Sequence, residues 1–269
     1  MSDSNLNHAA TSQLAAGPAT IGGVSLTLVR VYADRAAPDG LHSGCPHVHG
    51  LTDEAYYCVG GRGAVELHSL SQGFHTVELQ PGAYVQFSAN VVHRLINHDG
   101  SLEVLAIIAN AGLAERGDAR VWFGPEVDAD PRRYQQLMML ASEQGIEGAL
   151  RRRDEAVRAY VSFRQLWTTD RAKWEAELRR FIDVHLSDLA RQRQRLAAAI
   201  ESGPVAAATL SRRRLDALPH MLGSDLAGVC EPGQPETLGM CGRLRQLDRL
   251  VSVRVDTSIH ALTAGLRRQ

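Results

Sequence analysis

Two patterns of hydrophobic and polar positions divide the chain. Between residues 21 and 123, short β-rich runs alternate with turn residues: VSLTLVRVYA, EAYYCV, GAVELHSL, HTVEL, AYVQF, HRLIN and LEVLAIIA. The runs are interrupted at Gly60-Gly61, Gly73, Pro81-Gly82 and Asp99-Gly100. Many short strands with regular turns are typical of an all-β sandwich or barrel. We therefore predict a β-barrel over residues 21–125.

Beyond Asp130 the hydrophobic positions recur with helical spacing. Asp130 suits the N-cap of a helix and Pro131 its first position. The pattern predicts helices over residues 131–143, 146–167, 169–202 and 205–218, with Thr169 or Asp170 capping the third. After a Gly/Pro-rich loop at 223–235, we expect one or two more helices within 236–266.

These patterns predict an α+β fold with segregated domains. Residues 1–20 are expected to form a disordered leader, residues 21–125 the β-barrel and residues 130–269 a helical domain. No apolar run approaches the roughly 18 residues of a membrane-spanning helix. The four cysteines form no C-x-x-C pair and suggest no disulfide framework, so we expect a cytoplasmic protein.

Charge separates the two parts of the chain. Up to Asp130 there are 6 basic and 14 acidic residues, so the first part carries about −8 and the rest about +7. Opposite charges favour contact between the parts or with a second subunit, and we expect a homodimer. Arginine runs such as Arg151–Arg153 superficially suggest DNA binding, but acidic residues are interspersed and no compact helix-turn-helix is visible. We interpret these runs as solvated helix faces and expect no nucleic-acid partner.

The most informative segment reads PHVHGLTDEAYYCVGGRG. His47 and His49 are two residues apart and face the same side of an extended strand. Glu54 follows after a short bend, and the segment PGAYVQFSANVVHRLIN places His93 on a later strand. Three imidazoles and one carboxylate that meet inside a barrel suit a divalent transition metal. The alternative is a barrel whose histidines are structural, since histidine is common in this part of the chain.

These segments resemble the two motifs of the cupin superfamily. The first motif, G-x5-H-x-H-x3-4-E-x6-G, is matched by His47, His49, Glu54 and Gly61, with Leu41 in place of the first glycine. The second is matched by Gly82, His93 and Asn97, with Ser88 in place of proline and Asn90 in place of glycine. The resemblance covers fewer than half of the residues. It implies a double-stranded β-helix barrel that binds iron, or alternatively manganese, nickel or zinc, through His47, His49, Glu54 and His93.

Alternation along the strand places Tyr56 and Cys58 on the same side as Glu54. Tyr56 either packs in the core or orients the substrate and acts as a base, a role that a tyrosine has in some metal-dependent cupin lyases. We predict that Cys58, Val85, Phe87, Leu95 and Asn97 line a largely apolar substrate pocket.

The resemblance implies a metal-dependent enzyme that acts on a small organic molecule, and an oxygenase is the first expectation. The alternatives are a redox-neutral lyase, isomerase or cyclase, a non-catalytic small-molecule-binding cupin, and a cupin-type transcription regulator. Fold analogy does not choose among substrates.

Overall fold

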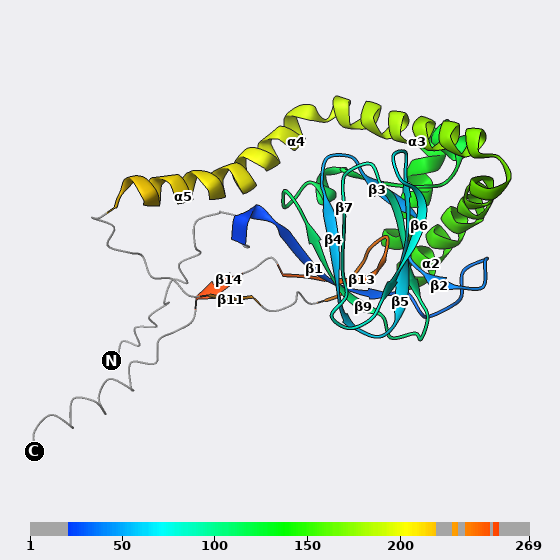
Figure 1. The fold of residues 1–269 in the computed structure, drawn as a ribbon, viewed down its shortest axis with the longest axis horizontal. Helices are drawn as coiled ribbons and strands as arrows, with labels where there is room; N and C mark the ends of the chain where they lie inside the picture. The colour runs from blue at the N-terminus through cyan, green and yellow to red at the C-terminus, as the bar shows by residue number, and fades with distance from the viewer. Residues whose placement is uncertain (1–20, 219–227, 231–234, 248–249, 253–269) are drawn as a thin grey trace, which may run out of the picture.

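A computed structural model describes residues 21–218, 228–230, 235–247 and 250–252 (Figure 1). The predicted leader over residues 1–20 lies outside this range, as do most of the predicted loop at 223–235 and residues 253–266 of the last predicted helices.

The predicted β-region contains ten strands. They are β1 (Ser25–Val31), β2 (His42–Ser43), β3 (His47–His49), β4 (Glu54–Gly60), β5 (Gly63–Ser69), β6 (Gly73–Leu79), β7 (Tyr84–Phe87), β8 (Val92–Asn97), β9 (Glu103–Ile108) and β10 (Ala119–Val121). Four short strands follow near the C-terminus: β11 (Gly228–Cys230), β12 (Thr237–Leu238), β13 (Gly242–Gln246) and β14 (Leu250–Ser252). The turns fall at the predicted breaks, and Asn90 takes the left-handed conformation that glycine often serves (φ 66°).

Two antiparallel sheets face each other. The first has the strand order β12-β13-β1-β9-β4-β7, and the second has the order β10-β3-β8-β5-β6, with β2 paired to β8. Alternation places Glu54, Tyr56 and Cys58 inside, each at most 3% exposed, while Tyr57 between them is 42% exposed. The barrel core between the sheets is apolar and includes Val65 and Leu95.

The helices occupy the chain after the barrel, as predicted. They are α1 (Pro125–Asp128), α2 (Pro131–Thr169), α3 (Arg171–Arg191), α4 (Arg193–Ile200) and α5 (Ala206–Asp216), with a π-helical stretch at Glu201–Val205. Asp130 and Asp170 cap α2 and α3 through their side chains. Gly145 interrupts α2 with a non-helical backbone (φ 60°, ψ −139°), at the break expected between residues 143 and 146.

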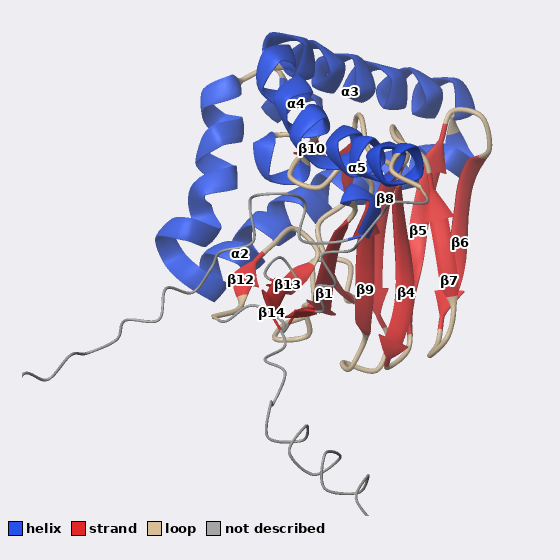
Figure 2. Cartoon of the chain, turned by 90° about the vertical axis from the view of Figure 1, so that its left-hand side faces the viewer, coloured by secondary structure: helices blue, strands red, loops and turns tan. Residues whose placement is uncertain are grey.

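Helices α2 and α3 cover the outer face of the second sheet (Figures 1 and 2). Val48 and Val92 point outward from β3 and β8 and pack against Tyr160, Trp174 and Phe181 of these helices. Consequently every residue of β3 and β8 is buried. The helical layer thus shields from water the back of the two strands that carry His47, His49 and His93.

A buried chain of hydrogen bonds joins this layer to the barrel. The Trp174 indole donates to Nδ1 of His68 (3.1 Å), so Nε2 of His68 carries the proton and donates to the Tyr160 hydroxyl (2.8 Å). Tyr160 donates in turn to Glu66 (3.1 Å). Burial, followed by the charge of Arg164, lowers the pKa of His68 to about 3. The ring is therefore neutral at neutral pH.

The last predicted helices are wrong where the structure describes them. Residues 237–238 and 242–246 form a β-hairpin instead, and β13 pairs with β1 from Val31↔Gly242 to Thr27↔Gln246. Only glycine fits at position 242, because a Cβ atom there would lie 2.1 Å from the carbonyl oxygen of Arg30. A segment more than 200 residues from β1 thus extends the first sheet of the barrel.

The expectation of a solvated helix face at Arg151–Arg153 is wrong for two of the three arginines. Arg152 and Arg153 are 5% and 0% exposed. Arg152 donates to the carbonyl of Gly239 in the hairpin (2.6 Å), and Arg153 donates to the carbonyl of Arg35 (2.7 Å). These charges hold the helices to the β-domain.

No helix in the described part of the chain has both the length and the apolar character needed to cross a bilayer.

We expect the free energy of unfolding of the metal-free protein to fall as the pH drops from about 6.5 towards 3. In this window the unfolded chain binds a proton at His68 that the folded protein excludes. One such group lowers the free energy of unfolding by up to about 1.4 kcal/mol per pH unit. Urea unfolding at about pH 7 and about pH 5 measures this loss of stability.

The His68→Gln variant should lose less stability between these two pH values than the wild type does. The control His98→Gln, at an exposed site, should lose as much as the wild type. A loss in His68→Gln equal to that of the wild type would contradict the assignment.

Candidate metal centre

Three strands bring the four predicted ligand residues to one point inside the barrel. His47 and His49 lie on β3, His93 lies opposite His47 on β8, and Glu54 begins β4 in the facing sheet. All four are buried, at 1% to 4% exposure. One ligand atom from each lies within 4.8 Å of the others.

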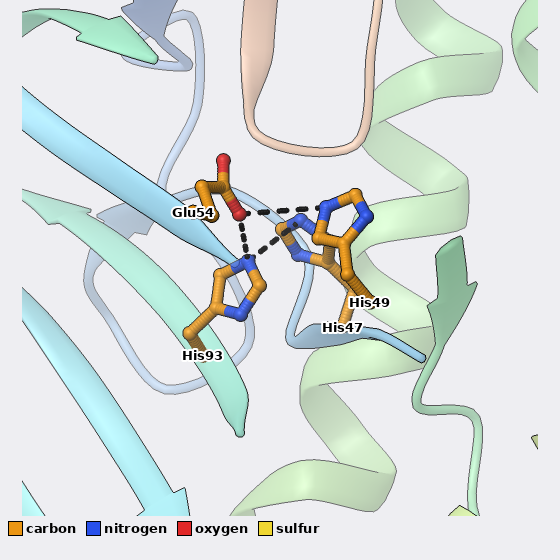
Figure 3. A group of neighbouring side chains, drawn as sticks. All are labelled: His47, His49, Glu54 and His93. Carbon is orange, nitrogen blue, oxygen red and sulfur yellow. Dashed lines mark hydrogen bonds and ion pairs between the residues drawn. The ribbon is translucent and has the colours of Figure 1, made fainter. Parts of the chain in front are cut away.

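Three of the six separations between the ligand atoms match one coordination sphere (Figure 3). Nε2 of His93 lies 3.0 Å from Nε2 of His47 and 3.1 Å from Oε2 of Glu54. Nε2 of His49 lies 3.4 Å from the same carboxylate oxygen. Two neighbouring ligands, each about 2.1 Å from the same ion, lie about 3.0 Å apart in octahedral geometry and about 3.4 Å apart in tetrahedral geometry.

The outer nitrogen of each imidazole faces an acceptor. Nδ1 of His47 lies 3.0 Å from the carbonyl of Cys45, and Nδ1 of His93 lies 3.0 Å from the carbonyl of Val91. Nδ1 of His49 faces Oδ2 of Asp118 at 3.5 Å. Since a carbonyl only accepts, Nδ1 of His47 and of His93 carries a proton, which leaves Nε2 of each neutral ring with its lone pair toward the centre. Metal-binding histidines have this arrangement.

This arrangement leaves unbalanced electron pairs in a dry core. When both rings are neutral, as metal binding requires, two Nε2 lone pairs face each other at 3.0 Å, and the Glu54 oxygen 3.1 Å from Nε2 of His93 receives no proton from that ring. Unpaired buried polar groups are costly, and a cation between them would satisfy all of them at once. The cluster therefore fits a divalent transition metal with nitrogen and oxygen ligands.

Burial and mutual proximity shift the pKa values of the ligands. Burial, and then the imidazoles of His93 and His49, lower the pKa of His47 well below its ordinary value. Burial alone would raise the pKa of Glu54, but the same two imidazoles outweigh it and lower that pKa. Burial opposes protonation of His49, but the carboxylates of Glu54 and Asp118 raise its pKa. A neutral His47 and an ionised Glu54 are the states that metal binding requires.

Asp118 supports the site from outside, and the sequence did not reveal it. Its carboxylate accepts from the Thr52 hydroxyl (2.6 Å) and from the amides of Gly50 and Leu51. Its backbone carbonyl lies 2.8 Å from Nε2 of His185 on α3. These contacts fix the carboxylate that faces His49 and connect it to the helical layer. No motif signals this role, since Asp118 lies far from both cupin-like segments in sequence.

Cys241 is a second residue that sequence reasoning missed. It lies in the turn of the β12–β13 hairpin, which passes above Glu54 in Figure 3. Its Sγ lies 3.6 Å from Nε2 of His47. Burial, and then the charge of Glu54, raise the pKa of this thiol well above its ordinary value. The expected helical structure of this segment concealed its approach to the barrel.

Tyr56 points into the same space. Its side chain is fully buried, and its hydroxyl has no hydrogen-bond partner of good geometry. Burial, and then the charge of Glu54, raise its pKa well above the ordinary value, so the phenol keeps its proton. Its ring lies 5.5 Å from that of Phe87 and 6.1 Å from that of His93.

Of the five predicted pocket residues, Phe87 lines a surface cavity of about 510 Å³, and its ring lies 4.6 Å from that of His93. Val85 and Leu95 pack in the barrel core and are not among the residues that line this cavity. Cys58 and Asn97 do not line this cavity: the Cys58 thiol donates to the Gly60 carbonyl, and the Asn97 amide donates to the Val31 carbonyl (3.0 Å). Hydrogen bonds within the barrel account for these two side chains.

The comparison with protein families agrees with the geometry. Residues 35–108 match a family model described as a cupin domain. Over these residues the chain is similar to a cupin domain. The matched segment includes all four predicted ligand residues but ends before Asp118 and the hairpin. A search of the curated proteins finds no match.

Solved structures with partial likeness to this chain include three from bacteria. WlaRA from Campylobacter jejuni, a TDP-fucose-3,4-ketoisomerase, is 7% identical over 31% of this chain and 57% of its own, with a TM-score of 0.26. A cupin protein from Bacteroides fragilis is 21% identical over 34% and 68% (TM-score 0.26). A protein with a double-stranded β-helix domain from Klebsiella pneumoniae is 17% identical over 36% and 71% (TM-score 0.25). This chain thus spans little more than half of WlaRA, and its activity must be argued from its own site.

We expect Asp118→Asn to weaken metal binding by roughly 10- to 100-fold, because a neutral amide orients the His49 ring less firmly than a carboxylate. Competition with a chromophoric chelator measures the affinity, and urea unfolding of the metal-free protein checks the fold. Asp99→Asn, an exposed site on the β8–β9 turn, is the control and should bind as the wild type does. Equal affinity in Asp118→Asn and wild type would rule out this role.

Proposed function

We propose that the protein is a metal-dependent enzyme that acts on a small organic molecule, and that its reaction uses dioxygen. The cluster of three imidazoles and one unpaired carboxylate, buried at 1% to 4% exposure, carries this proposal. Iron is the ion we expect, and manganese, nickel and zinc suit the same ligands. When bound, the ion would activate oxygen at a position that the protein leaves open, next to the bound substrate.

The cavity beside Phe87 is the place we assign to the substrate. It lies among the β5–β6 turn, the β7–β8 loop and Ile182 of α3, and its volume of about 510 Å³ suits a small organic molecule. Leu67 and Phe87 form the apolar side nearest the barrel interior. Because the Phe87 ring contacts His93, its rotation would join the cavity to the metal centre.

The apolar surroundings support an oxygen-dependent reaction. Phe87, Leu95 and Leu67 belong to the barrel core next to the cluster, and each is at most 8% exposed. Such walls exclude water from the ligand atoms and from a reactive substrate. The protein thus orients the substrate and keeps water out of the site, and few of its side chains near the cluster can donate or accept a proton.

Tyr56 supports a second candidate, a redox-neutral lyase, isomerase or cyclase. Its hydroxyl is buried within reach of the Glu54 carboxylate and the Cys241 thiol, and it makes no hydrogen bond of good geometry. A phenol in this position can donate a proton to a developing oxyanion of the substrate. In this reaction the ion would act only as a Lewis acid.

The two candidates differ in their need for oxygen. Protein loaded separately with Fe²⁺, Mn²⁺, Ni²⁺ and Zn²⁺ is incubated with a panel of sugars, carboxylic acids, flavonoids and thiols, and oxygen uptake and products are recorded. We expect turnover with a redox-active ion that consumes oxygen and stops under argon. Full turnover of zinc-loaded protein under argon would exclude the oxygenase and leave the redox-neutral enzyme.

Tyr56→Phe tests the second candidate with any substrate so found. If the hydroxyl transfers a proton, turnover should fall by more than about 100-fold. Removing an unpaired buried hydroxyl should not lower the free energy of unfolding. Tyr57→Phe, on the outer face of the same strand, is the control. A loss below about 10-fold would assign Tyr56 to packing.

A further inference from the structure

The C-terminal hairpin places a thiol next to the four ligand residues. Cys241 and His47 are 194 positions apart, yet Sγ of Cys241 lies 3.6 Å from Nε2 of His47. Cys241 is 9% exposed and belongs to the same core cluster as Tyr56. The thiol therefore faces the inside of the barrel, where the imidazoles converge.

The separation of 3.6 Å suits two ligands of one ion. Metal–sulfur and metal–nitrogen bonds of about 2.3 and 2.1 Å separate the two atoms by about 3.1 Å at a 90° angle and about 3.6 Å at 110°. The sulfur thus lies at a ligand-like distance from His47, although it stands outside the group of four ligand atoms that lie within 4.8 Å of one another.

Two buried polar atoms lie close to the thiol. Oε2 of Glu54 and the Tyr56 hydroxyl have no hydrogen bond of good geometry. Tyr56 interacts with both Glu54 and Cys241 through its side chain, and the charge of Glu54 acts on the thiol. A metal ion bound by Glu54 and Cys241 would satisfy the carboxylate and the thiol together.

The hairpin holds the thiol on a fixed support. The Gly239 carbonyl accepts from the Tyr32 hydroxyl (2.8 Å) and from Arg152 (2.6 Å), and the Met240 carbonyl accepts from the amide of Cys45 (2.9 Å). A side chain at position 44 would collide with Cys241, since its Cβ would lie 2.6 Å from the Cys241 Cα. Gly44 therefore permits the close approach of the turn.

We propose that Cys241 is a fifth protein ligand of the metal and binds it as a thiolate. The inference rests on the metal centre of the proposed function. A sulfur–metal bond forms, the thiol proton passes to solvent, and nothing is oxidised or reduced. Sulfur favours ferrous iron, cobalt, nickel and zinc over magnesium or calcium. Five protein ligands leave one octahedral position for an external molecule.

Cobalt(II) titrated into the metal-free full chain tests the assignment, because a cobalt–thiolate bond gives a near-ultraviolet charge-transfer band. We expect this band in the wild type and in Cys58→Ser, a buried-cysteine control whose thiol donates to the Gly60 carbonyl. Cys241→Ser should lose the band, keep the visible bands of bound cobalt, and bind cobalt roughly 10-fold or more weakly.

Bound cobalt without a charge-transfer band in the wild type would overturn the proposal and leave the four-ligand centre intact. An unchanged band in Cys241→Ser would overturn it too. If the wild type binds no cobalt, the metal centre itself is overturned. If it forms a cobalt–thiolate centre but shows no turnover, only the proposed enzyme activity is overturned.

If Cys241→Ser does not fold, X-ray absorption of the cobalt-loaded wild type decides. A shell of sulfur at about 2.3 Å from the metal is expected, and its absence refutes Cys241 as a ligand.

Discussion

The lone pairs that converge between the two sheets set the main constraint on this structure. His47 and His93 present Nε2 atoms 3.0 Å apart, next to the Glu54 carboxylate, whose Oε2 lies 3.1 Å from Nε2 of His93. Both strands are buried along their whole length, which holds these side chains inside the barrel. A cation between them would satisfy all of these groups at once, so we expect ion binding and folding to be coupled.

The helical layer contributes to this constraint. The aromatic side chains of α2 and α3 pack on β3 and β8 from outside, and the chain from Trp174 through His68 and Tyr160 to Glu66 fixes their position. His185 of α3 also contacts the backbone of Asp118, whose carboxylate faces His49. The helices are therefore part of the support of the site, although none of their side chains belongs to the cluster of ligand atoms.

Strand alternation and motif spacing in the sequence predicted the residues of the site that lie within the two cupin-like segments. Strand alternation placed His47, His49, Glu54 and Tyr56 on inward faces, and the second motif added His93; the structure brings all five together. Asp118 and Cys241 escaped prediction because only the tertiary fold brings them to the cluster. The hairpin was mistaken for a helix because its strands are short and rich in leucine and arginine, while β1 supplies the pairing that makes them strands.

The position of β13 in the sequence imposes an order of assembly. During synthesis, β1 emerges early with one unpaired edge, and more than 200 further residues must leave the ribosome before β13 can cover it. An open strand edge invites pairing with other chains, so the nascent protein is vulnerable during this interval. The same delay leaves the histidine cluster accessible from that side until the turn with Cys241 arrives. An ion would therefore reach the cluster more easily before this turn closes over it.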